Sequence, residues 1–228
     1  MIEKIKKSFL ILGIVVMAYP ALSNTNDTLL VRSNKKDVVE EKLQAMEVNG
    51  NYIVPADGLD SVEARGLILA ELKKQGVKGD INSSMKLSEI TASETWSNIG
   101  VQLYKVDINY AWLNGIFVIK NKKVLTMLSG VETKSFFLSD LDNDGQYEVY
   151  ANAFIGSGLV SEEIQGYNIA TNEFYQLSMR GKQDFHPYIE NGILMTEIHP
   201  SGNLKDKSVK SGRIILKESG NKKELSFE

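Results

Sequence analysis

The residues most able to do chemistry form one acidic segment, Asp140-Leu141-Asp142-Asn143-Asp144-Gly145-Gln146-Tyr147-Glu148. Carboxylates stand on alternate residues, Gly145 permits a sharp turn, and Glu148 adds an acid before a strand-like run. Ca²⁺ takes about six to eight oxygen ligands, so such a loop can direct several oxygens to one point. The segment predicts a calcium site. Its ligands are the carboxylates of Asp140, Asp142, Asp144 and Glu148, and the backbone carbonyl of Gln146.

The spacing after the loop separates this site from an EF-hand. In an EF-hand the last ligand is the twelfth loop residue, here Ala151, and a helix follows. An acid at the ninth position followed by a strand instead resembles the calcium hairpins of FG-GAP and related β-propeller repeats. The resemblance covers residues 136–179 and implies one blade-like four-stranded unit with a connection at Gly156-Ser157-Gly158. A propeller needs at least about four blades of roughly 40 residues, so the resemblance implies the hairpin and its ligands only.

An empty turn, or a site elsewhere in the chain, is the alternative to a calcium loop. Asp, Asn and Gly are common in turns for local hydrogen-bonding reasons, so a loop of this composition can also bind nothing. The only two histidines, His186 and His199, have no metal-ligand spacing, and a zinc site would have to assemble from distant segments. Each precedes a proline, which favours strand-edge or turn positions and a structural role. Gly156-Ser157-Gly158 lacks the spacing of a nucleophile elbow.

The first 23 residues predict a secretory signal peptide. Three lysines precede an apolar run from Phe9 to Tyr19, and Ala21-Leu22-Ser23 offers small residues for cleavage. An uncleaved anchor is the alternative, although the run is shorter than the roughly 20 residues that span a bilayer. We expect a secreted or periplasmic protein without stable membrane insertion after cleavage, with residues 24–34 as a flexible leader.

Composition excludes several classes of protein. The chain has no cysteine, so a disulfide scaffold and a thiolate metal site are excluded. Loss of the lysine-rich signal would take the net charge from −3 to about −5. The chain has no dense basic cluster, so we expect no nucleic-acid partner.

Apolar periodicity changes along the chain and indicates an α+β fold. Residues 35–98 read as a helical N-terminal region, with one helix over residues 35–46 and another from Asp60 to Gln75. The second begins with a capping box, Asp60 and Glu63, and its expected inward stripe is Val62, Ile68, Leu69 and Leu72. Residues 99–228 alternate with period two between short turns such as Asn191-Gly192, which predicts an antiparallel sheet or open barrel.

The sequence predicts a non-enzymatic binding or accessory protein of the bacterial envelope with a calcium-stabilised β-hairpin. Its partner is expected to be a protein or a glycan. One alternative is a secreted metal-dependent hydrolase in which the acidic loop and Glu162-Glu163 serve catalysis. Another is a partner-binding or inhibitor module that uses a sheet face.

Overall fold

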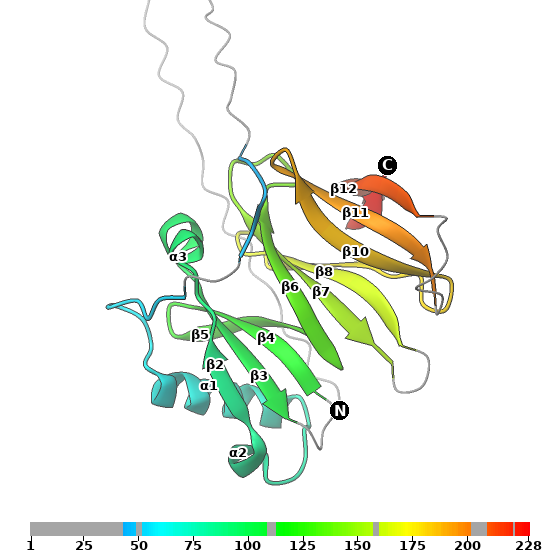
Figure 1. The fold of residues 1–228 in the computed structure, drawn as a ribbon. Helices are drawn as coiled ribbons and strands as arrows, with labels where there is room; N and C mark the ends of the chain where they lie inside the picture. The colour runs from blue at the N-terminus through cyan, green and yellow to red at the C-terminus, as the bar shows by residue number, and fades with distance from the viewer. Residues whose placement is uncertain (1–42, 49–51, 109–112, 157–159, 202–208, 221) are drawn as a thin grey trace, which may run out of the picture. The chain divides into compact units, whose positions relative to one another are not determined.

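The computed structural model describes residues 43–48, 52–108, 113–156, 160–201, 209–220 and 222–228. All of them belong to one compact unit, Glu41–Glu228. The expected signal peptide (residues 1–23), leader (residues 24–34) and most of the expected helix of residues 35–46 lie outside them. Among the described residues, 55% are in strands and 15% in helices. The described part of the chain is therefore mostly β (Figure 1).

The strands of the described residues form three antiparallel sheets (Figure 1). The central sheet contains, in spatial order, β1 (Met46–Glu47), β6 (Glu132–Ser139), β7 (Glu148–Ile155), β8 (Ser161–Asn168) and β9 (Glu173–Leu177). A second sheet contains β2 (Lys86–Glu89), β3 (Gln102–Ile108), β4 (Leu113–Lys120) and β5 (Lys123–Gly130). The third contains β10 (Gln183–Glu190), β11 (Ile193–Pro200), β12 (Lys210–Ser219) and β13 (Lys222–Phe227).

The prediction of an α+β fold, with N-terminal helices ahead of one sheet or open barrel, is wrong. The described residues of the expected helical region, 35–98, include two strands: β1 pairs with β6, and β2 pairs with β3. Met46, expected in a helix, begins β1. Pairing with the edge of an existing strand satisfies backbone groups and outweighs weak helix propensity over so short a segment. The described strands form open sheets and close no barrel.

The expected blade-like unit is also only part of a larger sheet. Strands β6, β7, β8 and β9 pair in consecutive order, but β1 adds a fifth strand beside β6. The turn prediction for Asn191-Gly192 is confirmed: both residues have positive φ, 51° and 72°, and Glu190 pairs with Ile193 across them. Positive φ at both central residues is the type I′ geometry that suits a tight hairpin.

Three helices occur in the described residues: α1 (Ser61–Lys74), α2 (Ile81–Ser84) and α3 (Ser93–Ile99). The capping box of α1 is confirmed, because Asp60 accepts from the backbone N–H of Glu63 at 2.8 Å and Glu63 accepts from that of Asp60 at 3.4 Å. Val62, expected to face inward, is 76% exposed. Ile68 and Leu72 of the expected stripe are buried as predicted, and Ala64 is the third buried residue of the helix. No helix among the described residues is long and apolar enough to cross a bilayer.

Apolar clusters show which faces of the sheets pack together. Helix α1 packs against one face of the second sheet, where Ile68 belongs to the same apolar cluster as Tyr104 and Phe117. The other face of that sheet shares a cluster with the central sheet, which includes Leu103 and Leu138. The opposite face of the central sheet packs on the third sheet through residues such as Tyr150 and Phe185. The central sheet is therefore covered on both faces, and its β6–β7 hairpin carries the acidic segment.

Candidate metal centre

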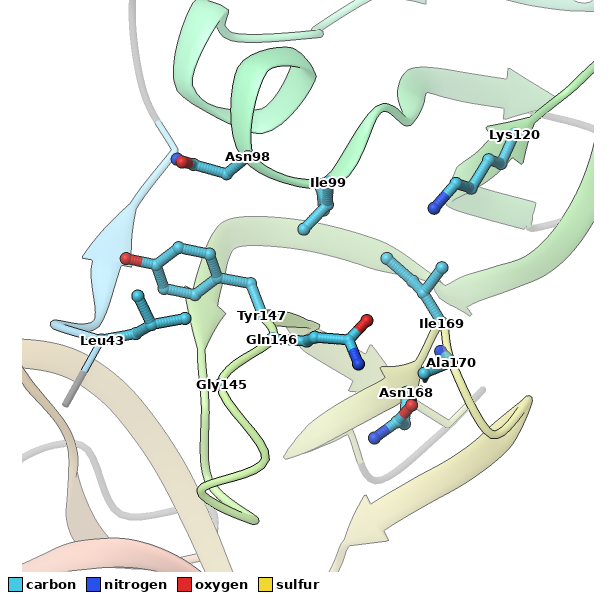
Figure 2. Close-up of a pocket in the computed structure, with 10 residues that line it drawn as sticks. All are labelled: Leu43, Asn98, Ile99, Lys120, Gly145, Gln146, Tyr147, Asn168, Ile169 and Ala170. Atoms are coloured by element: carbon cyan, nitrogen blue, oxygen red, sulfur yellow. Dashed lines mark hydrogen bonds between the residues drawn. The ribbon is translucent and has the colours of Figure 1, made fainter. Parts of the chain in front are cut away.

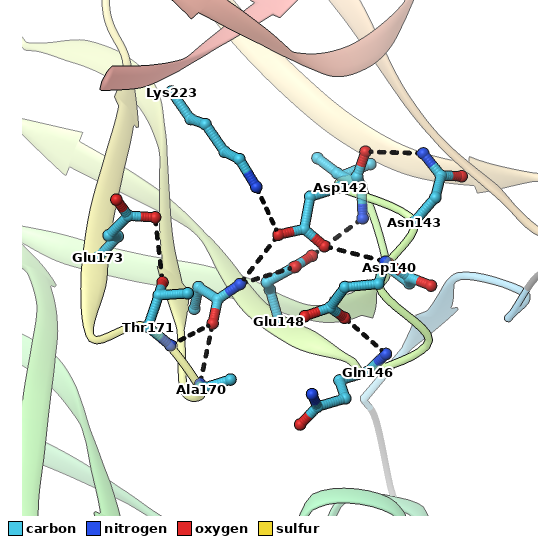
Figure 3. A network of polar contacts seen from close by, with 12 residues as sticks. Asp140, Asp142, Asn143, Gln146, Glu148, Ala170, Thr171, Glu173 and Lys223 are labelled. Atoms are coloured by element: carbon cyan, nitrogen blue, oxygen red, sulfur yellow. Dashed lines mark hydrogen bonds and ion pairs between the residues drawn. The ribbon is translucent and has the colours of Figure 1, made fainter. Parts of the chain in front are cut away.

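The acidic segment is the loop that joins β6 to β7. Ser139 and Glu148 pair across the end of the two strands, and the loop residues lie between them. Each of Asp140, Asp142, Asp144 and Glu148 offers one carboxylate oxygen, and these oxygens all lie within 4.8 Å of one another. Figure 3 shows Asp140, Asp142 and Glu148 gathered at the loop. The structure thus brings together the four acids expected from the sequence, and the cluster could hold a metal ion.

Local hydrogen bonds bend the loop back on itself. The two carboxylate oxygens of Asp140 accept from the backbone N–H groups of Asp144 and Gly145, each at 3.0 Å. Asp144 Oδ1 accepts from Gln146 N at 2.8 Å. Asn143 and Gly145 adopt the left-handed conformation, with φ of 57° and 83°. Asn and Gly tolerate this conformation best, which explains their positions in the turn.

Glu148 is the buried member of the cluster, with 1% of its surface exposed. Its Oε2 accepts from Leu141 N at 2.9 Å and from the hydroxyl of Tyr150 at 3.1 Å. Its Oε1 accepts from Asn168 Nδ2 at 3.2 Å. Three donors from β7, the loop and the end of β8 therefore fix this carboxylate toward the other acids.

Asp142 connects the loop to two other parts of the fold. Its Oδ2 accepts from Lys223 Nζ of β13 at 2.9 Å and from Asn168 Nδ2 at 3.2 Å (Figure 3). Asn168 is also held in place, because its Oδ1 accepts from the backbone N–H groups of Ala170 and Thr171. The loop is thereby tied both to the β8–β9 turn and to the third sheet.

Gln146 was expected to contribute its backbone carbonyl. The structure places it in the same loop, where its backbone N–H donates a hydrogen bond to Asp144 Oδ1. Its side chain lies in the wall of an adjoining pocket (Figure 2). The carbonyl's role as a ligand stays a prediction.

Burial makes negative charge costly at this site. It raises the pKa of Glu148 to about 8, and the charge of Asp142 adds to the rise. Burial also raises the pKa of Asp140, with smaller contributions from Asp144 and Asp142. Burial acts on Asp142 in the same direction, but hydrogen bonds with Lys223 and Glu148 lower its pKa overall. Four acids share one lysine among the described residues, so the cluster favours an added proton or cation.

A pocket of about 280 Å³ adjoins the loop on the side of Gly145 and Gln146 (Figure 2). Its apolar wall includes Leu43, Ile99 and Ile169, which the sticks in Figure 2 show around the opening. The side chain of Lys120 also lines it, and its amine makes no hydrogen bond or ion pair with another described residue. The rest of the lining is polar and includes Asn98, Gln146 and Asn168, so a pocket of mixed character with one cationic group suits a small amphipathic anion.

Three residues of the site were not expected from the sequence: Tyr150, Asn168 and Lys223. Asn168 is 26 residues from Asp142 along the chain, and Lys223 is 81 residues away. The turn-forming residues after Asn168 were visible in the sequence. No local signal connects that turn, or β13, to the acidic loop.

Glu162 and Glu163, considered as catalytic partners of the loop, do not form one site. Neighbouring residues of a strand point to opposite faces. Glu162 contacts His186, whereas Glu163 accepts from Gln165 and Gln176 at 2.7 and 2.8 Å. The two carboxylates therefore have separate partners on separate faces of β8.

Gly166 supports the site through Tyr150. The two residues are cross-strand partners, and a Cβ on Gly166 would overlap the Tyr150 ring. Gly166→Ala is therefore expected to displace the ring, weaken its bond to Glu148 and lower the free energy of unfolding by about 1–2 kcal/mol. Urea unfolding measures the change. Gly66→Ala is the matched control, because a Cβ there meets nothing within 4 Å and favours helix α1. Equal losses in both variants would contradict the prediction.

Comparison of the chain with models of protein families, with curated proteins and with solved structures found no match. The resemblance to FG-GAP hairpins therefore depends on the loop residues alone. The cluster of four carboxylates does not establish that motif.

Proposed function

We propose that the protein is an exported binding or accessory protein of the bacterial envelope whose β6–β7 hairpin is stabilised by Ca²⁺. The observation that carries the proposal is the convergence of Asp140, Asp142, Asp144 and Glu148 within 4.8 Å. These acids have only Lys223 as a cationic partner among the described residues. A divalent cation would offset the burial and the repulsion from Asp142 that together raise the pKa of Glu148.

The donor set favours Ca²⁺ over other ions. All four side chains offer oxygen, and a loop built from alternate carboxylates and backbone carbonyls is the kind of site that Ca²⁺ accepts in flexible geometry. Mg²⁺ requires a near-ideal octahedron and gives up its water reluctantly. Outside the cytoplasm, a dissociation constant of about 0.1–1 mM is sufficient for occupancy.

The position of the loop supports a structural role for the ion. Asp142 is bonded to β13 and to the end of β8, so an ion held by Asp142 and Glu148 would stiffen the junction between the central and third sheets. A metal-dependent hydrolase is the alternative, and it needs a substrate cleft at the metal. Among the described residues, one pocket beside the loop is lined by none of the four acids, and another is lined by Asp140 alone.

The pocket beside Gln146 supports the binding part of the proposal. It shares Asn168 with the acidic cluster, so an ion that orders the loop also orders one wall of the pocket. The amine of Lys120 would face a carboxylate or another anionic group of a protein or glycan partner. A partner-binding or inhibitor role for the same module is the remaining alternative.

Isothermal titration with Ca²⁺ tests the ion assignment. One ion per chain is expected, with a dissociation constant of about 0.1–1 mM, and Mg²⁺ is expected to bind more weakly. Asp144→Asn removes one charge from the cluster and keeps the oxygen that accepts from Gln146, so it is expected to weaken Ca²⁺ binding about tenfold or more.

Asp57→Asn is the matched control, because Asp57 is an exposed turn aspartate outside the loop. It is expected to leave Ca²⁺ affinity unchanged. No heat of binding in the wild-type chain, or equal weakening in both variants, would reject calcium binding by the loop.

A further inference from the structure

The only two histidines of the chain meet on one face of the β10–β11 hairpin. His186 pairs with Glu197, and Asp184 pairs with His199. Directly opposed residues and their second neighbours share a face, so these side chains form a cross-strand square. The two imidazole rings lie diagonally across it in an edge-to-face contact, with centroids 4.4 Å apart.

A carboxylate holds one nitrogen of each ring. His186 Nδ1 lies 3.2 Å from Glu162 Oε2, and His199 Nε2 lies 3.2 Å from Glu197 Oε2. A carboxylate only accepts hydrogen bonds, so the nitrogen facing it carries the proton in each ring. In the two neutral rings, the nitrogen with the lone pair is therefore Nε2 of His186 and Nδ1 of His199.

These two lone-pair nitrogens are buried, and neither has a hydrogen-bond partner in the part of the chain that the structure describes. A buried acceptor without a partner is costly, and in native proteins it commonly indicates a water molecule or an ion. Burial lowers the pKa of His186, and His199 and Lys134 add to the effect. The ring is therefore neutral at neutral pH, which is the form that binds metal.

We propose that His186 Nε2 and His199 Nδ1 bind a divalent transition-metal ion of the Zn²⁺ class. Imidazole nitrogen is a preferred ligand of Zn²⁺, and ligating histidines usually donate their other N–H to a carboxylate or carbonyl, as both rings do here. The rings must open slightly from their edge-to-face contact to admit the ion. Glu197 stays on the Nε2–H of His199, and water molecules complete four ligands.

This site differs in chemistry from the acidic loop. Nitrogen ligands select Zn²⁺, Cu²⁺ or Ni²⁺, whereas the loop offers only oxygen. A negative result for one site therefore does not affect the proposal for the other. If millimolar Ca²⁺ is present throughout, Ca²⁺ competes with Zn²⁺ for the loop, and Asp144→Asn shows whether any of the Zn²⁺ heat comes from the loop.

The experiment titrates ZnCl₂ into the untagged full chain in millimolar CaCl₂, by calorimetry and by ¹⁵N NMR of the imidazoles. Since the chain has only two histidines, every imidazole signal reports on this cluster. We expect one Zn²⁺ per chain, with shifts at His186 Nε2 and His199 Nδ1 and with Nδ1 of His186 and Nε2 of His199 still protonated.

Two variants remove only the ligating nitrogens. His186→Asn keeps a donor near the position of Nδ1 for Glu162, and His199→Gln keeps one near Nε2 for Glu197. Each is expected to weaken Zn²⁺ binding at least about tenfold without changing Ca²⁺ affinity. Asp144→Asn is the reciprocal control and is expected to leave Zn²⁺ binding unchanged.

Glu162→Gln tests the carboxylate that holds His186. It is expected to weaken Zn²⁺ binding by about 10- to 100-fold, because the ring loses the partner that fixes its tautomer and orientation. Absence of Zn²⁺ binding to the wild-type chain would overturn the proposal. Affinity that stays unchanged in both histidine variants, or NMR shifts confined to other residues, would overturn it as well.

Discussion

Without calcium, the free energy of unfolding is expected to fall by about 1–2 kcal/mol as the pH rises from about 6.5 to 8. The cause is Glu148, whose pKa is raised from 4.5 to about 8 by burial and by Asp142. The folded chain holds this proton more tightly than the unfolded chain. Stability from Glu148 is therefore greatest below pH 4.5 and is lost as the pH rises through about 8.

This pH range avoids the titration of Asp142 and most of that of His186, whose pKa values also differ between the folded and unfolded chains. The pKa of Asp142 lies below its ordinary value of 3.8, so Asp142 is ionised throughout this range. Burial lowers the pKa of His186 from 6.5. The effect of His186 on the free energy of unfolding therefore stops changing once the pH is above 6.5, its pKa in the unfolded chain. Burial also raises the pKa of Asp140 and of Glu162, so the part of the decline that reports on Glu148 is the part that Glu148→Gln abolishes.

Calcium is expected to remove this decline. A bound divalent ion stabilises the ionised form of Glu148 and raises the free energy of unfolding at pH 8 by about 1.4 kcal/mol, for 1 mM Ca²⁺ and a dissociation constant near 0.1 mM. Urea unfolding in chelator and in Ca²⁺, at several pH values, measures both effects. Parallel pH profiles in chelator and in calcium would contradict ion binding at Glu148.

The acidic cluster could be predicted from the sequence because its members are neighbours in the chain. Asp140, Asp142, Asp144 and Glu148 lie in one hairpin loop, and loop geometry follows from local residues such as Gly145. The capping box of α1 and the Asn191-Gly192 turn were predictable for the same reason. Each depends on hydrogen bonds or φ angles within a few residues.

The partners of the cluster could not be predicted, because they come from distant strands. Lys223 reaches Asp142 only because the third sheet packs on the central one, and period-two alternation does not say which strands pair. The contact between His186 and His199 depends in the same way on the register that places His186 opposite Glu197. A shift of one residue in that register would have moved one of the rings to the other face.

The division into three sheets was missed for a related reason. Apolar spacing identified strands after residue 99, but it could not show that β1 and β2, from the expected helical region, complete two of the sheets. Whether so short a segment forms a strand depends more on the sheet edge it pairs with than on its own residues. Leu103 and Tyr104 lie in different apolar clusters, which shows that β3 buries both faces, and strict alternation does not reveal this.

Glu148→Gln is expected to have opposite effects on stability in chelator and in Ca²⁺. In chelator at pH 8, it should raise the free energy of unfolding by about 2–4 kcal/mol, because it removes a buried negative charge whose pKa is near 8. The amide oxygen can still accept from Leu141 and Tyr150, and the amide nitrogen can donate to Asp142 in place of the carboxyl proton. The amide nitrogen cannot accept from Asn168 Nδ2, which keeps only its bond to Asp142, and this lost bond offsets part of the gain. The same variant should lose the calcium-dependent stabilisation.

Urea unfolding of Glu148→Gln with chelator and with Ca²⁺ separates these effects. Glu190→Gln removes one exposed charge at the end of β10 and is expected to change neither condition by more than about 0.5 kcal/mol. If its three donors already stabilise the buried charge of Glu148 well, Glu148→Gln instead lowers the free energy of unfolding in chelator. That result would show that the loop has no excess negative charge for a cation to neutralise, because the three hydrogen bonds to Glu148 would suffice without one.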